Sequence, residues 1–138
     1  SYWSMPPLQL QSFNTVMVAG EACSSALVKL HFQQIPFTNL FNEYGPTEGT
    51  VWCTAHQIQA EDAQRAVPIG RPIPYVENYI LDEQLQPVPV GVVGELYVGG
   101  AGVAKGYLHR PEQTAKKFLT HPFRKDEGER IYKTQISR

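Results

Sequence analysis

The feature that most constrains the fold is the residue pattern of the first third of the chain. Residues 13–45, FNTVMVAGEACSSALVKLHFQQIPFTNLFNEYG, begin with alternating and β-branched residues, reach Gly20, and continue with apolar residues at helical spacing from Leu27. A second short apolar run closes the segment. The pattern predicts a strand, a glycine turn, a helix and a strand, which form a β-α-β unit. Loops at the carboxyl ends of such strands commonly carry binding sites.

The second half of the chain has the pattern of antiparallel strands. Residues 55–74, AHQIQAEDAQRAVPIGRPIP, are polar with scattered proline and glycine, so we interpret them as a connector with a subdomain boundary near Arg65. From residue 75 the chain alternates β-branched or aromatic residues with polar ones, interrupted by DEQLQP and PVGVVG. This alternation predicts an antiparallel meander with hairpin turns. Pro111 then stands at the expected start of a short basic helix.

Composition indicates an ordinary globular chain and argues against two classes of partner. The sequence has 138 residues, enough for one domain or a piece of one. Charged residues make up 18% and the net charge is -1, which leaves no surplus of positive charge for nucleic acid or acidic membranes. The sequence contains no run of about 18 apolar residues and no basic segment followed by an apolar run at its start. We therefore expect a cytoplasmic protein that binds neither nucleic acid nor membrane.

The cysteines and histidines do not form a metal-ligand pattern. Cys23 and Cys53 are far apart and lack the CxxC or Cys/His spacing of a metal site or a redox pair. Two reduced thiols in the core are the favoured interpretation. The histidines show no ligand spacing either, and surface or hydrogen-bonded positions are expected for all of them: His31, His56, His109 and His121.

The segment NEYGPTE, residues 42–48, is the first candidate for a functional site. Gly45 permits a turn with left-handed dihedrals, and the proline that follows it stiffens the backbone and removes an amide donor. On this support Tyr44 offers an aromatic face for a base, Thr47 a hydroxyl for a phosphate, and Glu48 a carboxylate for magnesium. Together these side chains describe a nucleotide site.

A purely structural interpretation of the same loop is also open. The Gly-Pro pair then forms only a turn, and Tyr44 fills the core. Thr47 and Glu48 begin a helix in this interpretation, as its cap and its first-turn acid. Residue spacing alone favours the structural interpretation over a nucleotide site.

Further motifs follow the loop in a fixed order and carry a family resemblance. They are PIGRPIP, GELYVGGAGVAKGYL, RPEQTAKKF and RIYKT, and the preceding VAGEACSSALV is similar to the strand and helix that come before the loop in that family. The chain resembles the adenylation domain of nonribosomal peptide synthetases, in the adenylate-forming superfamily. One motif would be weak, but five in order are highly specific. The pattern Asn-x-Tyr-Gly-Pro-Thr-Glu also separates amino-acid activators from acyl-CoA ligases and luciferases.

The resemblance implies an α/β fold that is incomplete. Residues 1–65 would be a β-α-β piece of the large adenylation subdomain with the nucleotide-binding loop. Residues 66–138 would be a distorted antiparallel β-barrel subdomain with a short helix, truncated at its C-terminal end. The strands of the first unit would lack the neighbours that the missing N-terminal part supplies, so we expect the isolated chain to fold marginally or to aggregate.

The resemblance also implies a reaction. The carboxylate of an amino acid attacks the α-phosphorus of ATP, pyrophosphate leaves, and the phosphopantetheine thiol of a peptidyl carrier protein then takes the aminoacyl group. Other domains of a synthetase are implied as partners. Carried over by residue, Asn42 would contact the adenine amino group, Tyr44 would stack on adenine, and Gly45 would belong to the ATP-binding loop. Thr47 would bond the phosphate and Glu48 would hold magnesium, and these two are the catalytic candidates.

The same resemblance points to residues that select the amino acid. They are Met17, Ala19, Glu43, Val51 and Trp52. A carboxylate at Glu43 would favour a cationic or hydroxyl-bearing substrate side chain, because a buried unpaired charge is costly. Trp52 would narrow the pocket or stack on the substrate. Alternatively Glu43 faces water and Trp52 serves as core.

The glycine-rich segment GELYVGGAGVAKGY is interpreted as structural. It lacks the Gly-Lys-Ser/Thr ending of a P-loop, and no parallel strand and helix flank it. Its glycines are expected to allow close approach of backbone segments, with Glu95 as an ion-pair or hydrogen-bonding partner. Lys105 stands where the family more usually has arginine.

The resemblance stops after Thr134. The family continues with Gly-Asp-Leu, whose aspartate binds the ribose hydroxyls, whereas this chain reads QISR. An upstream phosphate loop, the aspartate that pairs with the substrate amine, and a C-terminal subdomain with its lysine are also not in the sequence. We therefore expect a fragment of an adenylate-forming ligase that is inactive by itself. The alternatives are a non-catalytic binding module derived from that domain, or a fragment of an acyl-CoA or aryl-acid ligase.

Overall fold

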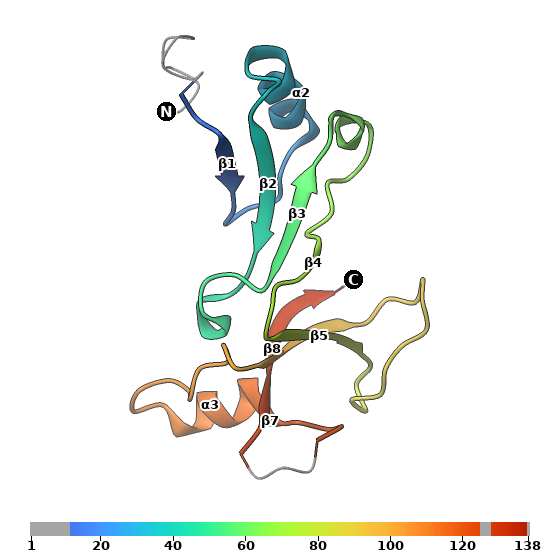
Figure 1. Ribbon diagram of the computed structural model, residues 1–138. Coiled ribbons are helices and arrows are strands. Elements are labelled where there is room, and N and C mark those ends of the chain that lie inside the picture. Colours follow the sequence, from blue (N-terminus) through green and yellow to red (C-terminus); the bar gives the residue numbers. More distant parts are fainter. Residues whose placement is uncertain (1–11, 125–127, 138) are drawn as a thin grey trace. The chain divides into compact units, whose positions relative to one another are not determined.

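The computed structural model describes residues 12–124 and 128–137, which fall into two compact units (Figure 1). Within these residues, unit 1 comprises 12–44 and 54–71, and unit 2 comprises 45–53, 72–124 and 128–137. The chain therefore passes from unit 1 to unit 2 directly after Tyr44, in the middle of the NEYGPTE motif. The predicted division into residues 1–65 and 66–138 stays a prediction.

Unit 1 contains the predicted β-α-β unit. Strand β1 (Thr15–Val18), helix α2 (Ser25–Gln34) and strand β2 (Asn39–Tyr44) follow one another, and the two strands pair in parallel from Thr15↔Asn39 to Val18↔Asn42. The helix begins after Ser24, whose side-chain oxygen accepts a hydrogen bond of 3.2 Å from the backbone N–H of Leu27. The core of the unit is built mainly on Val28, Leu40 and Ile58.

The predicted connector contains a strand that the sequence analysis missed. Strand β3 (Thr54–Ile58) pairs antiparallel with β2, and the short 3₁₀ helix η3 (Ala60–Gln64) follows it. The sequence of β3, TAHQI, has no alternating apolar pattern, and only the two ends of the strand are buried. The interpretation of residues 55–58 as connector is therefore wrong, because pairing with β2 forms the strand where local residue preference does not. Strand β4 (Arg71–Pro72) completes the sheet order β1-β2-β3-β4.

Unit 2 contains the predicted antiparallel strands, but their order β5-β6-β8-β7 is not that of a simple meander. Strand β5 (Val76–Leu81) pairs with β6 (Glu95–Gly100), β6 pairs with β8 (Arg130–Ser137), and β8 pairs with β7 (Phe118–Thr120). All three pairings are antiparallel, and the core is built on Leu81, Tyr97 and Ile131. Helix α3 (Pro111–Lys117) precedes β7 and begins at proline, as predicted. The short helix η2 (Thr47–Gly49) also belongs to this unit.

The two cysteines differ in burial. Cys53 is buried and Cys23 is half-buried, and both are free. Burial raises the pKa of the Cys53 thiol to about 11 and also raises the pKa of Cys23. None of the helices within residues 12–124 and 128–137 has the length and apolar character of a membrane-spanning helix.

Candidate functional site

The structure divides the predicted site residues between the two units. Asn42, Glu43 and Tyr44 end strand β2 in unit 1, where Met17 and Ala19 also lie. The others belong to unit 2, namely Gly45, Thr47, Glu48, Val51 and Trp52. Each group is described within its own unit.

In unit 1, Met17 and Glu43 share one face of the sheet. Parallel pairing places Met17 beside Phe41 and Val18 beside Asn42, and side chains alternate between the two faces along a strand. Because Val16 and Val18 pack on the α2-covered core, Met17 and Glu43 lie on the opposite face. Ala19 directly follows β1. Met17 is 58% exposed. Met17 and Ala19 line a pocket of about 480 Å³ at the turn between β1 and α2, and Glu43 is half-buried on β2.

Asn42 lies on the other face of the same strand and is 4% exposed. Its side-chain Nδ2 donates a hydrogen bond of 2.8 Å to the backbone oxygen of Pro68, within PIGRPIP. This bond orients the amide, and Oδ1 is then the group that can accept from a ligand. An adenine amino group is a donor, so the chemistry of Asn42 suits the role that the resemblance implies.

A charged cluster that joins His56 of β3 to Asp62 and Arg65 stabilises unit 1. The carboxylate of Asp62 accepts hydrogen bonds from the Gln59 backbone N–H at 3.0 Å, from His56 Nε2 at 2.8 Å, and from two nitrogens of Arg65 at 2.7 and 3.0 Å. The Gln59 N–H first, and then His56 and Arg65, lower the pKa of Asp62 well below its usual range, against the opposing effect of burial. The cluster is confined to unit 1 and gives His56 the hydrogen-bonded position expected for it.

In unit 2, Gly45 is required for close packing of the loop. A Cβ at Gly45 would lie closer than 3.0 Å to the backbone of Trp52 and Cys53, so no other residue fits without a backbone shift. The expectation that Gly45 supplies left-handed dihedrals is wrong, because the residues of this loop with positive φ are Thr50 at 61° and Val51 at 75°. The loop folds back upon itself, and the glycine makes room for the returning backbone.

The NEYGPTE motif ends in one tight turn. Helix η2 begins at Thr47 after Pro46, whose oxygen accepts from the Gly49 N–H at 3.0 Å, and Glu48 lies in its first turn. The structural interpretation is thus correct in placing Glu48 in the first turn of a helix, although the cap residue is Pro46. Thr47 is exposed, as are Val51 at 65% and Trp52 at 43%. Trp52 is therefore not a core residue of unit 2.

The carboxylate of Glu48 lies among tyrosine hydroxyls. Tyr107 donates a hydrogen bond to Glu48 Oε1, and its hydroxyl lies 3.4 Å from that of Tyr132. Partial burial opposes ionisation of Glu48, but the bonds from Tyr107, its own backbone N–H and Tyr132 outweigh this effect and lower the pKa of the carboxyl. Burial, followed by the bond to Glu48, raises the pKa of Tyr107. Burial, followed by the bonds with Tyr107 and Glu48, raises the pKa of Tyr132. Neither tyrosine was a predicted site residue, although Tyr107 lies in the motif GELYVGGAGVAKGYL and Tyr132 lies in RIYKT.

The glycine-rich segment packs along η2, as its structural interpretation predicts. The Ala104 N–H donates to the backbone oxygen of Glu48 at 2.8 Å, and Thr50 Oγ1 donates to the oxygen of Gly102 at 2.6 Å. A Cβ at Gly102 would lie 3.2 Å from the Gly49 oxygen, so the segment approaches the loop closely. Glu95 forms an ion pair of 3.2 Å with Lys133, which confirms its expected role as a partner.

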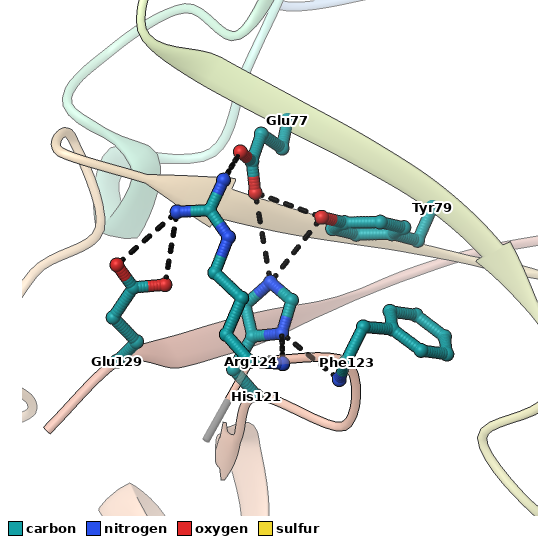
Figure 2. Close-up of polar contacts among 6 residues, drawn as sticks. All are labelled: Glu77, Tyr79, His121, Phe123, Arg124 and Glu129. Carbon is teal, nitrogen blue, oxygen red and sulfur yellow. Dashed lines mark hydrogen bonds and ion pairs between the residues drawn. The ribbon is translucent and has the colours of Figure 1, made fainter. Parts of the chain in front are cut away.

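A second polar cluster in unit 2 is centred on His121 (Figure 2). His121 Nδ1 accepts from the backbone N–H groups of Phe123 and Arg124, both at 3.2 Å. The ring proton therefore lies on Nε2, which is 3.2 Å from the hydroxyl of Tyr79 and 3.5 Å from Glu77 Oε2. With a side chain 1% exposed, His121 is a hydrogen-bonded interior residue, as expected. Across residues 12–124 and 128–137, no group of three or more potential metal ligands occurs.

Comparison with known proteins identifies the family. Residues 3–108 match the model of the AMP-binding enzyme family, which covers more than half of the chain. The chain belongs to this family.

Relatives of known structure and function narrow the assignment. A linear gramicidin synthase of Brevibacillus parabrevis is 54% identical over 110 residues, which are 77% of this chain and 2% of the synthase. The nonribosomal peptide synthetase PA1221, which contains adenylation and PCP domains, superposes with a TM-score of 0.84 and 29% identity over 95% of this chain and 27% of its own. AB3403, a four-domain nonribosomal peptide synthetase bound to AMP and glycine, gives a TM-score of 0.78 and 40% identity over 89% of this chain and 9% of its own.

These matches identify the domain to which the chain belongs. The chain is a fragment of a nonribosomal peptide synthetase adenylation domain, which confirms the family resemblance and the incomplete α/β fold. It spans 2% of the length of the first curated relatives that it matches.

Proposed function

We propose that the protein containing this chain activates an amino acid with ATP. The carboxylate oxygen of the amino acid forms a bond to the α-phosphorus, and the bond from that phosphorus to the bridging oxygen of pyrophosphate breaks. The observation that carries the proposal is Glu48, which lies on a tight turn within the segment that matches the AMP-binding enzyme family. The lowered pKa of its carboxyl group favours the ionised form. AMP use is supported by the family and by the AMP-bound relative AB3403.

The residues of the loop have complementary roles toward ATP in this proposal. Asn42 Oδ1 accepts from the adenine amino group, since its Nδ2 is held by Pro68. Tyr44 stacks on the base, and Gly45 lets the loop turn tightly enough to present its polar groups. The exposed hydroxyl of Thr47 donates to a phosphate oxygen and so helps to hold the phosphate in line for attack.

Glu48 suits a magnesium ion on chemical grounds. Its carboxylate is half-buried, its pKa is lowered, and carboxylate oxygen is the ligand type that magnesium prefers. When bound, magnesium offsets the negative charge of the phosphates. Glu48 would hold the ion near the phosphates while Thr47 orients a phosphate oxygen. These two residues are the proposed catalytic groups within this chain.

The proposed selectivity residues differ in the chemistry that they offer. In unit 1, Met17 and Ala19 line one pocket and are apolar, and Glu43 on β2 is acidic. Glu43 would favour a substrate side chain that is cationic or carries a hydroxyl group. The same selective role is proposed separately for the exposed Val51 and Trp52 of unit 2.

The proposed product passes to a carrier protein. The sulfur of a phosphopantetheine thiol attacks the aminoacyl carbonyl carbon, a thioester forms, AMP leaves, and the thiol proton goes to solvent. The PCP domain of the relative PA1221 and the multidomain relative AB3403 support a carrier protein and other synthetase domains as partners.

ATP–pyrophosphate exchange with a panel of amino acids tests the proposal. We expect exchange in a protein with the complete adenylation domain, and none in the 138-residue chain, which matches 27% of PA1221. Glu48→Gln in the complete domain should lower exchange about a hundredfold, because metal stabilisation is worth several kcal/mol. Exchange by the short chain would show that residues outside it are dispensable. No exchange by the complete domain with any amino acid would contradict the proposed function.

A further inference from the structure

Unit 2 supplies a hydroxyl group directly to the carboxylate of Glu48. The Tyr107 hydroxyl donates to Glu48 Oε1, and the hydroxyl oxygen of Tyr132 lies 3.4 Å from that of Tyr107. The contact joins residues separated by 59 positions, from η2 and from the end of the glycine-rich segment. It is therefore a tertiary contact that neither the turn nor the segment requires for its own local geometry.

The position of Tyr107 is held by several independent contacts. Its backbone N–H donates to Thr114 Oγ1 of α3 at 2.9 Å. The preceding Gly106 has φ of 137°, and a Cβ there would lie closer than 3.0 Å to the Thr114 side chain. The Tyr107 ring packs edge-on against Phe118 with centroids 5.4 Å apart, and Phe118 lies 5.1 Å from the Tyr132 ring. Both hydroxyls are thus carried on an ordered aromatic group.

The backbone at Glu48 is held by hydrogen bonds that do not involve Tyr107. Its oxygen accepts from the Ala104 N–H at 2.8 Å, and η2 is closed by its own hydrogen bonds from Gly49 and Thr50. The conformation of the turn therefore does not depend on the Tyr107 hydroxyl. What the hydroxyl restricts is the direction of the carboxylate.

We propose that Tyr107, supported by Tyr132, is a positioning residue that fixes the Glu48 carboxylate for a divalent cation. The inference rests on the proposed function, in which Glu48 holds magnesium. An ionised carboxylate has about four lone-pair positions, so the bonds from Tyr107, Tyr132 and the Glu48 backbone N–H still leave capacity for a cation. A hydrogen bond to a metal-binding carboxylate restricts its orientation, and loss of such a partner typically weakens metal binding about 10- to 100-fold.

The test uses tyrosine-to-phenylalanine changes in a protein with the complete adenylation domain. Tyr107→Phe and Tyr132→Phe remove one oxygen each and keep the rings that pack on Phe118. Tyr79→Phe is the matched control, since the hydroxyl of Tyr79 also donates to a carboxylate of unit 2, Glu77 Oε2 at 2.8 Å (Figure 2). The probe is Mn²⁺, and its retention by the protein with α,β-methylene-ATP is measured by electron paramagnetic resonance. The Mg²⁺ dependence of pyrophosphate exchange is the second readout.

The expected results separate positioning from a general structural role. Tyr107→Phe should raise the Mn²⁺ dissociation constant about tenfold. It should raise the Mg²⁺ concentration for half-maximal exchange similarly, with the KM for the amino acid unchanged. Tyr132→Phe should raise both the Mn²⁺ dissociation constant and the Mg²⁺ concentration for half-maximal exchange by a smaller factor. Tyr79→Phe should change neither quantity. If Tyr107→Phe does not fold, Tyr132→Phe still decides the question.

Two other outcomes would overturn the inference in different ways. In the first outcome, the wild-type protein catalyses exchange, but Tyr107→Phe and Tyr132→Phe both bind Mn²⁺ within twofold of wild type. This outcome would refute the positioning role and leave the proposed function intact. No amino-acid-dependent exchange by the wild-type protein would refute the proposed function and the inference with it.

Discussion

Replacement of Asp62 by asparagine is expected to destabilise unit 1 through loss of half of the hydrogen bonds to its buried carboxylate. Asp62 is 1% exposed. One carboxylate oxygen accepts from the Gln59 N–H and His56, and the other accepts twice from Arg65. Asparagine keeps one oxygen, so two donors lose their acceptor whichever way the amide lies. Hydrogen bonds to charged groups contribute about 1.5–3 kcal/mol each. Because the two losses are not additive, we expect a decrease of about 3 kcal/mol in the free energy of unfolding.

Urea unfolding of a protein with the complete domain measures this loss. With a slope of about 2 kcal/mol per molar urea, the midpoint should fall by about 1.5 M. Hydrogen exchange over residues 54–65 locates the change, because the Gln59 N–H should exchange faster in Asp62→Asn. Asp82→Asn is the matched control: a single Asp82 oxygen accepts from the Gln84 and Gln86 N–H groups, at 2.9 and 2.8 Å, and asparagine keeps that oxygen.

The same cluster gives a pH dependence with a definite sign. The pKa of Asp62 is lower in the folded protein than its unfolded value of about 4. Its contribution is therefore present above that value and is lost as the pH falls through the folded pKa. Wild type and Asp62→Asn should converge in stability in acid. Equal midpoints at pH 7, or an equal loss in Asp82→Asn, would refute the reasoning.

Three further predictions concern particular residues. Gly45→Ala should lower both the melting temperature and pyrophosphate exchange of the complete domain, because its Cβ would lie closer than 3.0 Å to the Trp52 backbone; Gly99→Ala, whose nearest contact would be 3.4 Å, should change exchange little. Gln135 has φ of 68° where β8 bulges against β6, so Gln135→Gly should raise stability by about 0.5–1 kcal/mol in a urea titration, and a decrease would contradict the strain argument. A thiol reagent at pH 8 should modify Cys23 before Cys53, whose pKa is raised to about 11 by burial, and equal rates in the folded protein would contradict the assigned burial.

Local sequence patterns predicted the strands and helices that are specified by residues within or next to them. The alternating residues before Gly20 and the helical spacing after Ser24 are sufficient for β1 and α2, because periodicity and capping act within a few residues. Proline at the start of α3 works in the same way. Strand β3 could not be found by these signals, since TAHQI becomes a strand through its register with β2.

Residue types and their order were enough to predict the family and the β-α-β unit, and they led to the proposal that residues 42–48 bind a nucleotide. The packing of the folded chain was needed to show why Gly45 is required, that Thr50 and Val51 have positive φ, and that Tyr107 and Tyr132 lie at Glu48. Tyr107 lies 59 positions from Glu48, and no local pattern encodes a contact across that separation. Such contacts arise when the strands and the glycine-rich segment pack, and packing also orients the Glu48 carboxylate.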